Sequence, residues 1–344
     1  MSAFDQPLLI ANSGYHIGHQ MSVRAAEEQG FFQEEGLLEY AFEGAGLIPG
    51  PFEREGLSLV MKERGVDIAT AVNLDSLILH RARGADLYVV GAWRHMPAVK
   101  LYAAPHITSL EELRGARVGG REPGGITELF VTYCLSKVGI NAATDIQWVY
   151  DPVFSYRRDP AHMEAILAGK VDAAESAPPY SDQLLRQGYR LILDSDQVYP
   201  TGRPGKVVVA SSRTIERRGE ELKAFLRGNI RGFWFVRDSA NFEYLKDLEA
   251  RLRQATHNED ERRLRIVTDP KKLEEWIMPV RGFFAAEALE RVIDEMVTLG
   301  KLERPLPVHE VLRDEPARQA FQELTSRPSL QPALSKAQAA ERYG

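Results

Sequence analysis

Strand-like and helix-like segments alternate over residues 7–210, and this alternation limits the folds open to the chain. Short apolar runs bounded by turn-forming residues occur at residues 7–14, 38–42, 66–72 and 87–92, with helical patterns between them. A second alternating series begins after residue 98, and residues 215–298 are mainly helical in pattern. Alternation of this kind predicts an α/β fold, with mostly parallel sheets flanked by helices and a helical C-terminal region.

The composition is typical of a soluble globular protein. The 344 residues suffice for two domains with separate cores, and 44% hydrophobic with 27% charged residues gives no bias toward disorder. The net charge of −6 argues against a nucleic-acid partner, since such proteins normally carry a basic face. No apolar run approaches the roughly 18 residues of a membrane span, so no membrane insertion is expected.

The N-terminal residues lack the basic, apolar and small-residue regions of a secretory signal. As written, the chain is therefore expected in the cytoplasm, and in the periplasm or outside the cell only if a signal has been removed. The single cysteine, Cys134, lies among apolar residues of a predicted helix. A buried structural thiol is expected there rather than a nucleophile.

A glycine-rich segment, residues 114–135, reads as a short strand, a turn and an amphipathic helix that opens near Thr127. Gly124 and Gly125 let the backbone approach a neighbour or a ligand closely. A helix start with free N–H groups attracts carboxylates, sulfonates and phosphates. An ordinary strand-to-helix connection without a ligand is the alternative.

Four short motifs, in order, resemble those of one protein family. They are QGFFQEEGL at residues 29–37, GVDIA at 65–69, SLEELRGARVG at 109–119 and AGKVDAA at 168–174. Together they resemble the type II periplasmic solute-binding proteins, in the group for alkanesulfonates, nitrate and thiamin-pyrimidine precursors. The resemblance covers roughly residues 7–240.

The resemblance implies a two-lobed, periplasmic-binding-protein-like fold with the ligand in the cleft between the lobes. The first lobe would comprise residues 1–97 and 207–300, and the second residues 98–206. Residues 301–344, which are rich in proline, are expected to form a separate C-terminal tail.

Polar residues near the ends of the first lobe's strands are candidates for the site. Ser13, Tyr15 and His16 follow the first strand. His16 and His19 share a helix face if a helix starts by Tyr15, but no nearby carboxylate or cysteine completes a metal site, so no metal is expected. A ligand contact and a surface role remain open for these histidines.

Further candidates follow the later strands. Asn73 and Asp75 come after the third strand, and Arg94 and His95 after the fourth, where an arginine can pair with a carboxylate or sulfonate. In the second lobe, Arg121 lies in the glycine-rich turn and Glu175 ends a strand. Each of these charged residues has a surface or structural salt bridge as its alternative role.

Two functions are compatible with these residues. The first is a small-molecule binding protein for an organic anion, a carboxylate or sulfonate, resembling ABC-transporter substrate-binding proteins, with a permease as partner if the protein is exported. The second is a cytoplasmic decarboxylase, lyase or desulfinase on the same fold, acting on an aromatic or heteroaromatic acid. No cofactor is expected for either function.

The resemblance gives no catalytic residues for the second function. The thiamin-precursor synthase of this fold places a histidine near the position where this chain has Asp75 and Ser76. The sulfinate desulfinase of this fold uses a cysteine after the first strand, where this chain has Ser13 and Gly14. Whether the protein is an enzyme therefore stays undecided at this level.

Overall fold

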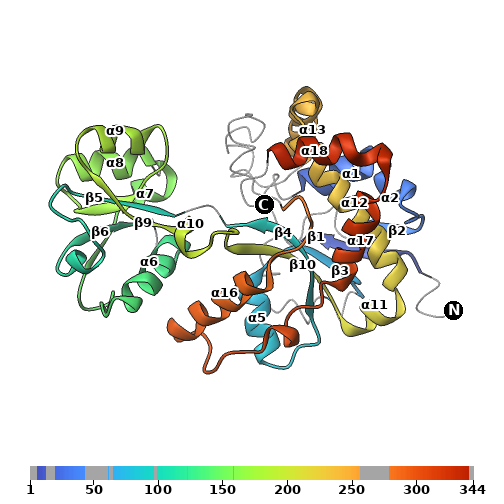
Figure 1. Cartoon of the computed structure of the whole chain (residues 1–344), viewed down its shortest axis with the longest axis horizontal. Helices are drawn as coiled ribbons and strands as arrows, with labels where there is room; N and C mark the ends of the chain where they lie inside the picture. Colours follow the sequence, from blue (N-terminus) through green and yellow to red (C-terminus); the bar gives the residue numbers. More distant parts are fainter. Residues whose placement is uncertain are drawn as a thin grey trace. The chain divides into compact units, whose positions relative to one another are not determined.

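The computed structural model describes residues 6–12, 20–42, 61, 65–96, 99–121, 123–157, 159–255 and 279–340 (Figure 1). Its residues divide into two compact units. Unit 1 consists of Met1–Pro97, Arg203–Val292 and Leu306–Gly344, and unit 2 of Ala98–Gly202 and Ile293–Pro305. None of the helices in the described part of the chain is long and apolar enough to cross a membrane.

Unit 1 contains a sheet of five strands in the order β2-β1-β3-β10-β4. The strands are β1 (Leu8–Asn12), β2 (Tyr40–Phe42), β3 (Ile68–Asn73), β4 (Tyr88–His95) and β10 (Pro204–Ala210). β1 runs parallel to β2 and β3, whereas β10 runs antiparallel to both β3 and β4. The sheet is therefore mostly parallel, and the strand that enters it from late in the sequence has the opposite direction.

Helices bury the apolar side chains of this sheet. They are α1 (Met21–Glu28), α2 (Phe31–Glu34), α5 (Leu74–Ala82), α11 (Ser212–Arg217), α12 (Gly219–Arg237), α13 (Phe242–Ala255) and α16 (Ala286–Thr298), the last of which continues into unit 2. α12 packs against α1 and α2, and α5 packs along β3 and β10. Residues 256–278, part of the region predicted to be mainly helical, lie outside the described residues, as does most of the predicted helical stretch between the runs at 38–42 and 66–72.

Two glycines explain how closely α12 approaches its neighbours. A Cβ on Gly228 would lie 2.4 Å from a ring carbon of Phe32, and one on Gly232 would lie 2.4 Å from the backbone oxygen of Ser22. Both distances are far shorter than any real carbon contact, so only glycine allows α1 and α2 to pack this close to α12.

The segment that the sequence analysis sets apart as a C-terminal tail contains two helices, α17 (Glu315–Thr325) and α18 (Gln331–Ala339). Both pack against α12, and Ala317, Ala320 and Leu324 of α17 are fully buried. These small and apolar residues recur on one face of α17, which is why the helix has a side to bury.

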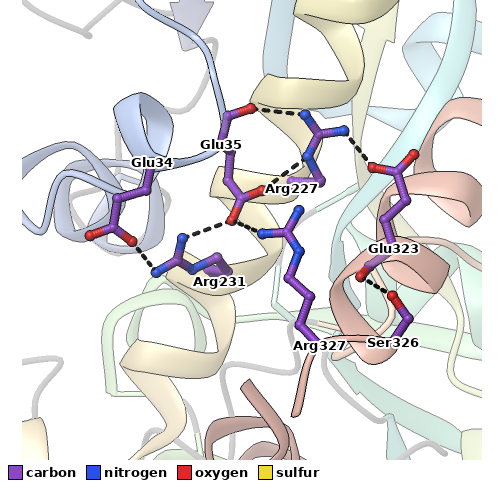
Figure 2. Close-up of polar contacts among 7 residues, drawn as sticks. All are labelled: Glu34, Glu35, Arg227, Arg231, Glu323, Ser326 and Arg327. Atoms are coloured by element: carbon purple, nitrogen blue, oxygen red, sulfur yellow. Dashed lines mark hydrogen bonds and ion pairs between the residues drawn. The ribbon is translucent and has the colours of Figure 1, made fainter. Parts of the chain in front are cut away.

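A buried carboxylate connects this C-terminal segment to the N-terminal helices (Figure 2). The Glu35 side chain is fully buried and accepts hydrogen bonds from Arg227, Arg231 and Arg327, with donor–acceptor distances of 3.0, 2.7 and 2.8 Å. Arg227 also donates to Glu323 at 2.7 Å. The carboxylate thus joins residues from α12 and from the segment after α17.

Unit 2 contains a second sheet of five strands, in the order β7-β6-β8-β5-β9. The strands are β5 (Lys100–Ala103), β6 (Arg117–Gly120), β7 (Gln147–Tyr150), β8 (Ala173–Glu175) and β9 (Arg190–Asp194). β6 is parallel to β7 and β8, and β5 is antiparallel to β8 and β9. The main helices of the unit are α6 (Ile126–Lys137), α7 (Pro152–Arg157), α8 (Asp159–Leu167) and α9 (Tyr180–Arg186). Both sheets confirm the predicted α/β class.

Candidate functional site

The glycine-rich segment forms the strand, turn and helix that its sequence predicts. A Cβ on Gly119 would lie 3.1 Å from the Cβ of Ala174, and one on Gly120 would lie 2.7 Å from the Tyr150 ring, so a side chain at either position would require its neighbour to move. Gly124 has a φ of +73°, which a residue with a side chain rarely adopts. Gly125 is the N-cap of α6, so no side chain of the N-cap residue caps the start of this helix.

Arg121, Thr127 and Glu175 meet at the carboxyl ends of β6 and β8. Arg121 donates from Nη2 to Oε1 of Glu175 at 2.8 Å, and the Thr127 hydroxyl donates to Oε2 at 2.6 Å. Because β6 and β8 are adjacent and parallel, residues that follow them emerge at the same edge of the sheet. The Glu175 side chain is only 9% exposed and that of Arg121 is 24% exposed, so the arginine side chain is the more exposed partner.

His162 of α8 lies next to this cluster. It is fully buried against the ring of Phe154, with centroids 4.6 Å apart, and neither imidazole nitrogen makes a hydrogen bond of good geometry with a described residue. Burial, and after it the positive charge of Arg121, lowers the pKa of His162 to about 4. The imidazole is therefore neutral at physiological pH. The buried hydroxyl of Ser176 follows Glu175 in the chain and also makes no hydrogen bond to a described residue.

In unit 1, Asn73 and Asp75 lie at the start of α5. The Asn73 side chain caps the helix by accepting from the Ser76 N–H at 3.1 Å. Asp75 is paired with Arg203, whose Nη2 lies 3.2 and 3.3 Å from the two carboxylate oxygens. The backbone just before Asn73 is strained, since Ala71 has a φ of +56°. Both candidates thus have structural partners within unit 1.

Arg94 and His95 end β4. Arg94 is half-buried and pairs in register with Lys206 of β10, and His95 is buried with its ring edge-on to Phe284 at 4.8 Å. The remaining candidates, Ser13, Tyr15 and His16, lie outside the described residues, and so does His19. Their predicted contacts stay predictions.

Sequence reasoning missed three residues of these two regions: His162, Ser176 and Arg203. His162 lies inside a helix that the sequence predicts, but nothing in its spacing indicates that α8 covers the end of β8. Ser176 directly follows the candidate Glu175, and this adjacency was a usable signal. Arg203 precedes the strand that returns to unit 1, but its pairing with Asp75 spans 128 positions and has no local signature.

The site contains neither a reactive cysteine nor a recognisable metal centre among the described residues. Burial raises the pKa of the Cys134 thiol to about 12, and the nearby Glu295 carboxylate adds to this effect. A thiol with so high a pKa is a poor nucleophile at neutral pH. Within the described ranges, histidine, cysteine and carboxylate side chains form no group of three or more that is arranged to hold a metal ion.

The two five-stranded sheets, each with one antiparallel strand beside its edge and helices around it, place the protein in the class of two-lobed α/β solute-binding folds. The model of the NMT1-like family matches residues 15–248, which is more than half of the chain. The chain belongs to the NMT1-like family. No curated protein sequence matches it significantly.

Solved structures with the same fold include two that are named as periplasmic anion-binding proteins. A putative periplasmic sulfonate-binding protein SsuA of a sulfonate ABC transporter from Methylobacillus flagellatus KT aligns with a TM-score of 0.62 and 12% identity, over 93% of this chain and 95% of that one. The periplasmic nitrate-binding protein NrtA from Synechocystis PCC 6803 aligns with a TM-score of 0.57 and 13% identity, over 97% and 98%.

A DszB mutant in complex with biphenyl-2-sulfinic acid also has this fold. It aligns with a TM-score of 0.50 and 14% identity, over 92% of this chain and 99% of that one. Identities this low show a common fold and leave the ligand to be argued from this chain's own residues.

Proposed function

We propose that this protein is a solute-binding protein that takes a small organic anion, a carboxylate or sulfonate, at the strand ends of unit 2. The observation that carries the proposal is the position of Arg121. Its side chain, which is 24% exposed, follows β6 in the glycine-rich turn, before the first residues of α6. Sulfonate and nitrate, which appear in the names of two proteins with this fold, are anions of the kind that a guanidinium binds.

The surroundings of Arg121 support an anion more than a cation. The N-terminus of α6 carries the partial positive charge of the helix dipole, and its first N–H groups have no side-chain cap. Gly125 puts no side chain at the helix start, although the Gly124 N–H already donates to Glu128 at 2.8 Å. The carboxylate at this edge, Glu175, is already hydrogen-bonded on both oxygens.

A role in transport would explain why the protein binds an organic anion. If the protein is exported, its partner would be the permease of an ABC importer, because the sulfonate-binding protein named above belongs to an ABC transporter. Asn73, Asp75, Arg94 and His95 of unit 1 remain candidates for further ligand contacts.

The test is a binding measurement on the purified chain with nitrate, ethanesulfonate and benzoate. Thermal stability should rise with at least one of these anions, because a ligand that binds only the folded state stabilises it. Calorimetry should then show that Arg121→Ala weakens binding by about 2–5 kcal/mol and that Arg121→Lys recovers only part of this loss.

Arg117 provides a matched control, since it is paired with Asp172 at 2.8 Å in the same sheet but at the start of β6. Arg117→Ala should leave the affinity within about 0.5 kcal/mol of the original value. Stabilisation by organic cations alone, or equal affinities of the Arg121 and Arg117 variants, would contradict the proposal.

A second candidate function is a lyase or desulfinase acting on an aromatic acid. The observation that favours it is the neutral imidazole of His162, which lies near the Glu175 backbone and the charge of Arg121, since imidazole is a usual group of acid–base catalysis. Incubation with biphenyl-2-sulfinic acid, the compound present in one structure of this fold, followed by mass spectrometry, tests this function. Unchanged sulfinate after prolonged incubation would count against it.

A further inference from the structure

The arginine proposed to bind the anion already holds an anionic group of the protein. Glu175 contacts Arg121 through one oxygen and Thr127 through the other, at 2.8 and 2.6 Å, and its side chain is nearly excluded from solvent. A second anion that arrives at Arg121 therefore brings two negative charges to one guanidinium. In a place with little water, repulsion between them is only weakly screened.

A proton on Glu175 would remove this repulsion. When two acidic groups share a buried site, one of them becomes protonated at a pH at which an isolated carboxylate is charged. We propose that binding of an anion at Arg121 is coupled to the uptake of one proton by Glu175. This inference rests on the proposed function, because it needs an anion to bind at Arg121.

The chemical step is a simple protonation. A proton from solvent forms an O–H bond at the Glu175 carboxylate, no bond between heavy atoms changes, and no other group is released. Thr127 provides the compensating hydrogen bond: its hydroxyl donates to Glu175 in the structure, and a hydroxyl can equally accept from a protonated carboxyl. Glu175 then leaves Arg121 to the anion without losing its own hydrogen bond.

The titratable and charged groups on the neighbouring elements have other roles. His162 of α8 is buried and neutral, with a pKa lowered by burial and by Arg121. Lys100 of β5 is paired with Asp194 and Asp196. Glu128 of α6 accepts hydrogen bonds from the Tyr150 hydroxyl at 2.6 Å and the Gly124 N–H at 2.8 Å. Among the residues that the structure describes, Glu175 is the carboxylate hydrogen-bonded to Arg121, so it is the one that an anion arriving at Arg121 would meet.

The experiment is calorimetric titration of the full chain with ethanesulfonate and nitrate, which do not titrate between pH 6 and 8. Tris, imidazole and triethanolamine serve as buffers, because sulfonate or phosphate buffers would compete for the site. The dependence of the binding heat on the buffer's ionisation heat gives the number of protons taken up, and we expect about one per anion. The affinity should then fall about tenfold for each unit of pH increase.

Glu175→Gln keeps the shape of the side chain and removes its charge. This variant should bind the anion with no proton uptake, with an affinity independent of pH and at least about tenfold higher than that of the original protein at pH 8. Asp172→Asn is the control, since it removes the carboxylate of the Arg117 pair in the same sheet. Its proton uptake should remain near one.

Each other outcome has a definite meaning. Absence of binding to any anion in the original protein would overturn the proposed function together with this inference. Binding without proton uptake would overturn this inference alone and leave the proposed function standing. Uptake that persists in Glu175→Gln but is lost in His162→Gln would assign the proton to the imidazole and overturn the role given to Glu175.

Discussion

His162 shows how burial sets the chemistry of a single residue in this protein. The imidazole lies against Phe154 and near the positive charge of Arg121. Burial away from water and the charge of Arg121 both oppose its protonation. An exposed histidine is half protonated near pH 6.5, whereas His162 gains a proton only near pH 4. The residue is thus held in its neutral form over the physiological range.

This shift predicts a loss of stability in acid. Above pH 6.5 His162 is neutral in both the folded and the unfolded chain, so its contribution to stability is complete. Between pH 6.5 and about 4 the unfolded chain takes up the proton and the folded chain does not, so the free energy of unfolding should fall by about 3 kcal/mol. Urea unfolding of the original protein and of His162→Gln at pH 7.5, 6, 5 and 4.5 measures this. The variant should lose less stability with acid, and parallel curves would refute the assignment.

At the scale of elements, glycines decide how α12 and β6 pack. Gly228 and Gly232, four residues apart on α12, face α2 and α1, and Gly119 and Gly120 let β6 fit between its neighbours. In each case the glycine is explained by a close neighbour rather than by a turn: the Ser22 backbone at Gly232, and side-chain atoms at the other three. These contacts hold the N-terminal helices on unit 1 and shape the strand that leads to Arg121.

Gly232→Ala should therefore destabilise the protein by about 1–3 kcal/mol, because the added methyl group would meet the Ser22 carbonyl at 2.4 Å and α1 would have to shift. Gly219→Ala is the matched control. Gly219 is the first residue of the same helix, and a Cβ there has no atom within 4 Å. Its replacement should change stability by less than about 1 kcal/mol, and in the favourable direction. Equal losses in the two variants, measured by urea unfolding, would refute the close-packing explanation.

At the scale of the whole molecule, long-range ion pairs connect the ends of the sequence. Arg327 reaches Glu35 across 292 positions, and Arg227 and Arg231 of α12 meet the same carboxylate (Figure 2). The buried Glu35 thereby ties the N-terminal helices, α12 and the C-terminal segment into unit 1.

Glu35→Gln should destabilise the protein by about 3 kcal/mol or more, because it removes the charge of a fully buried carboxylate that three arginines share. Glu323→Gln serves as the control, since Glu323 contacts Arg227 but is 45% exposed. Its replacement should cost at most about 1 kcal/mol. Similar losses in the two variants, again from urea unfolding, would show that burial does not distinguish the two carboxylates.

Much of the fold could be predicted from local pattern. The runs at residues 7–14, 66–72 and 87–92 contain β1 and most of β3 and β4, and the glycine-rich segment contains β6 and most of α6. Arg121, Thr127 and Glu175 could also be predicted, each individually, as candidate ligand-binding residues, because polar residues after strands in such folds commonly lie near ligands. Their pairing with each other could not be predicted, since it depends on β6 and β8 becoming neighbours 54 positions apart.

The sequence by itself determined the α/β class, the order of strands and helices, and membership of the family, because periodicity and short motifs are local properties of the chain. Only the tertiary structure decided that Arg121 shares Glu175 with Thr127, that α8 buries His162 beside them, and that Arg203 pairs with Asp75. Each of these contacts joins distant positions. Their energies arise from burial and from the charge of neighbours, and the packed fold alone brings those neighbours together.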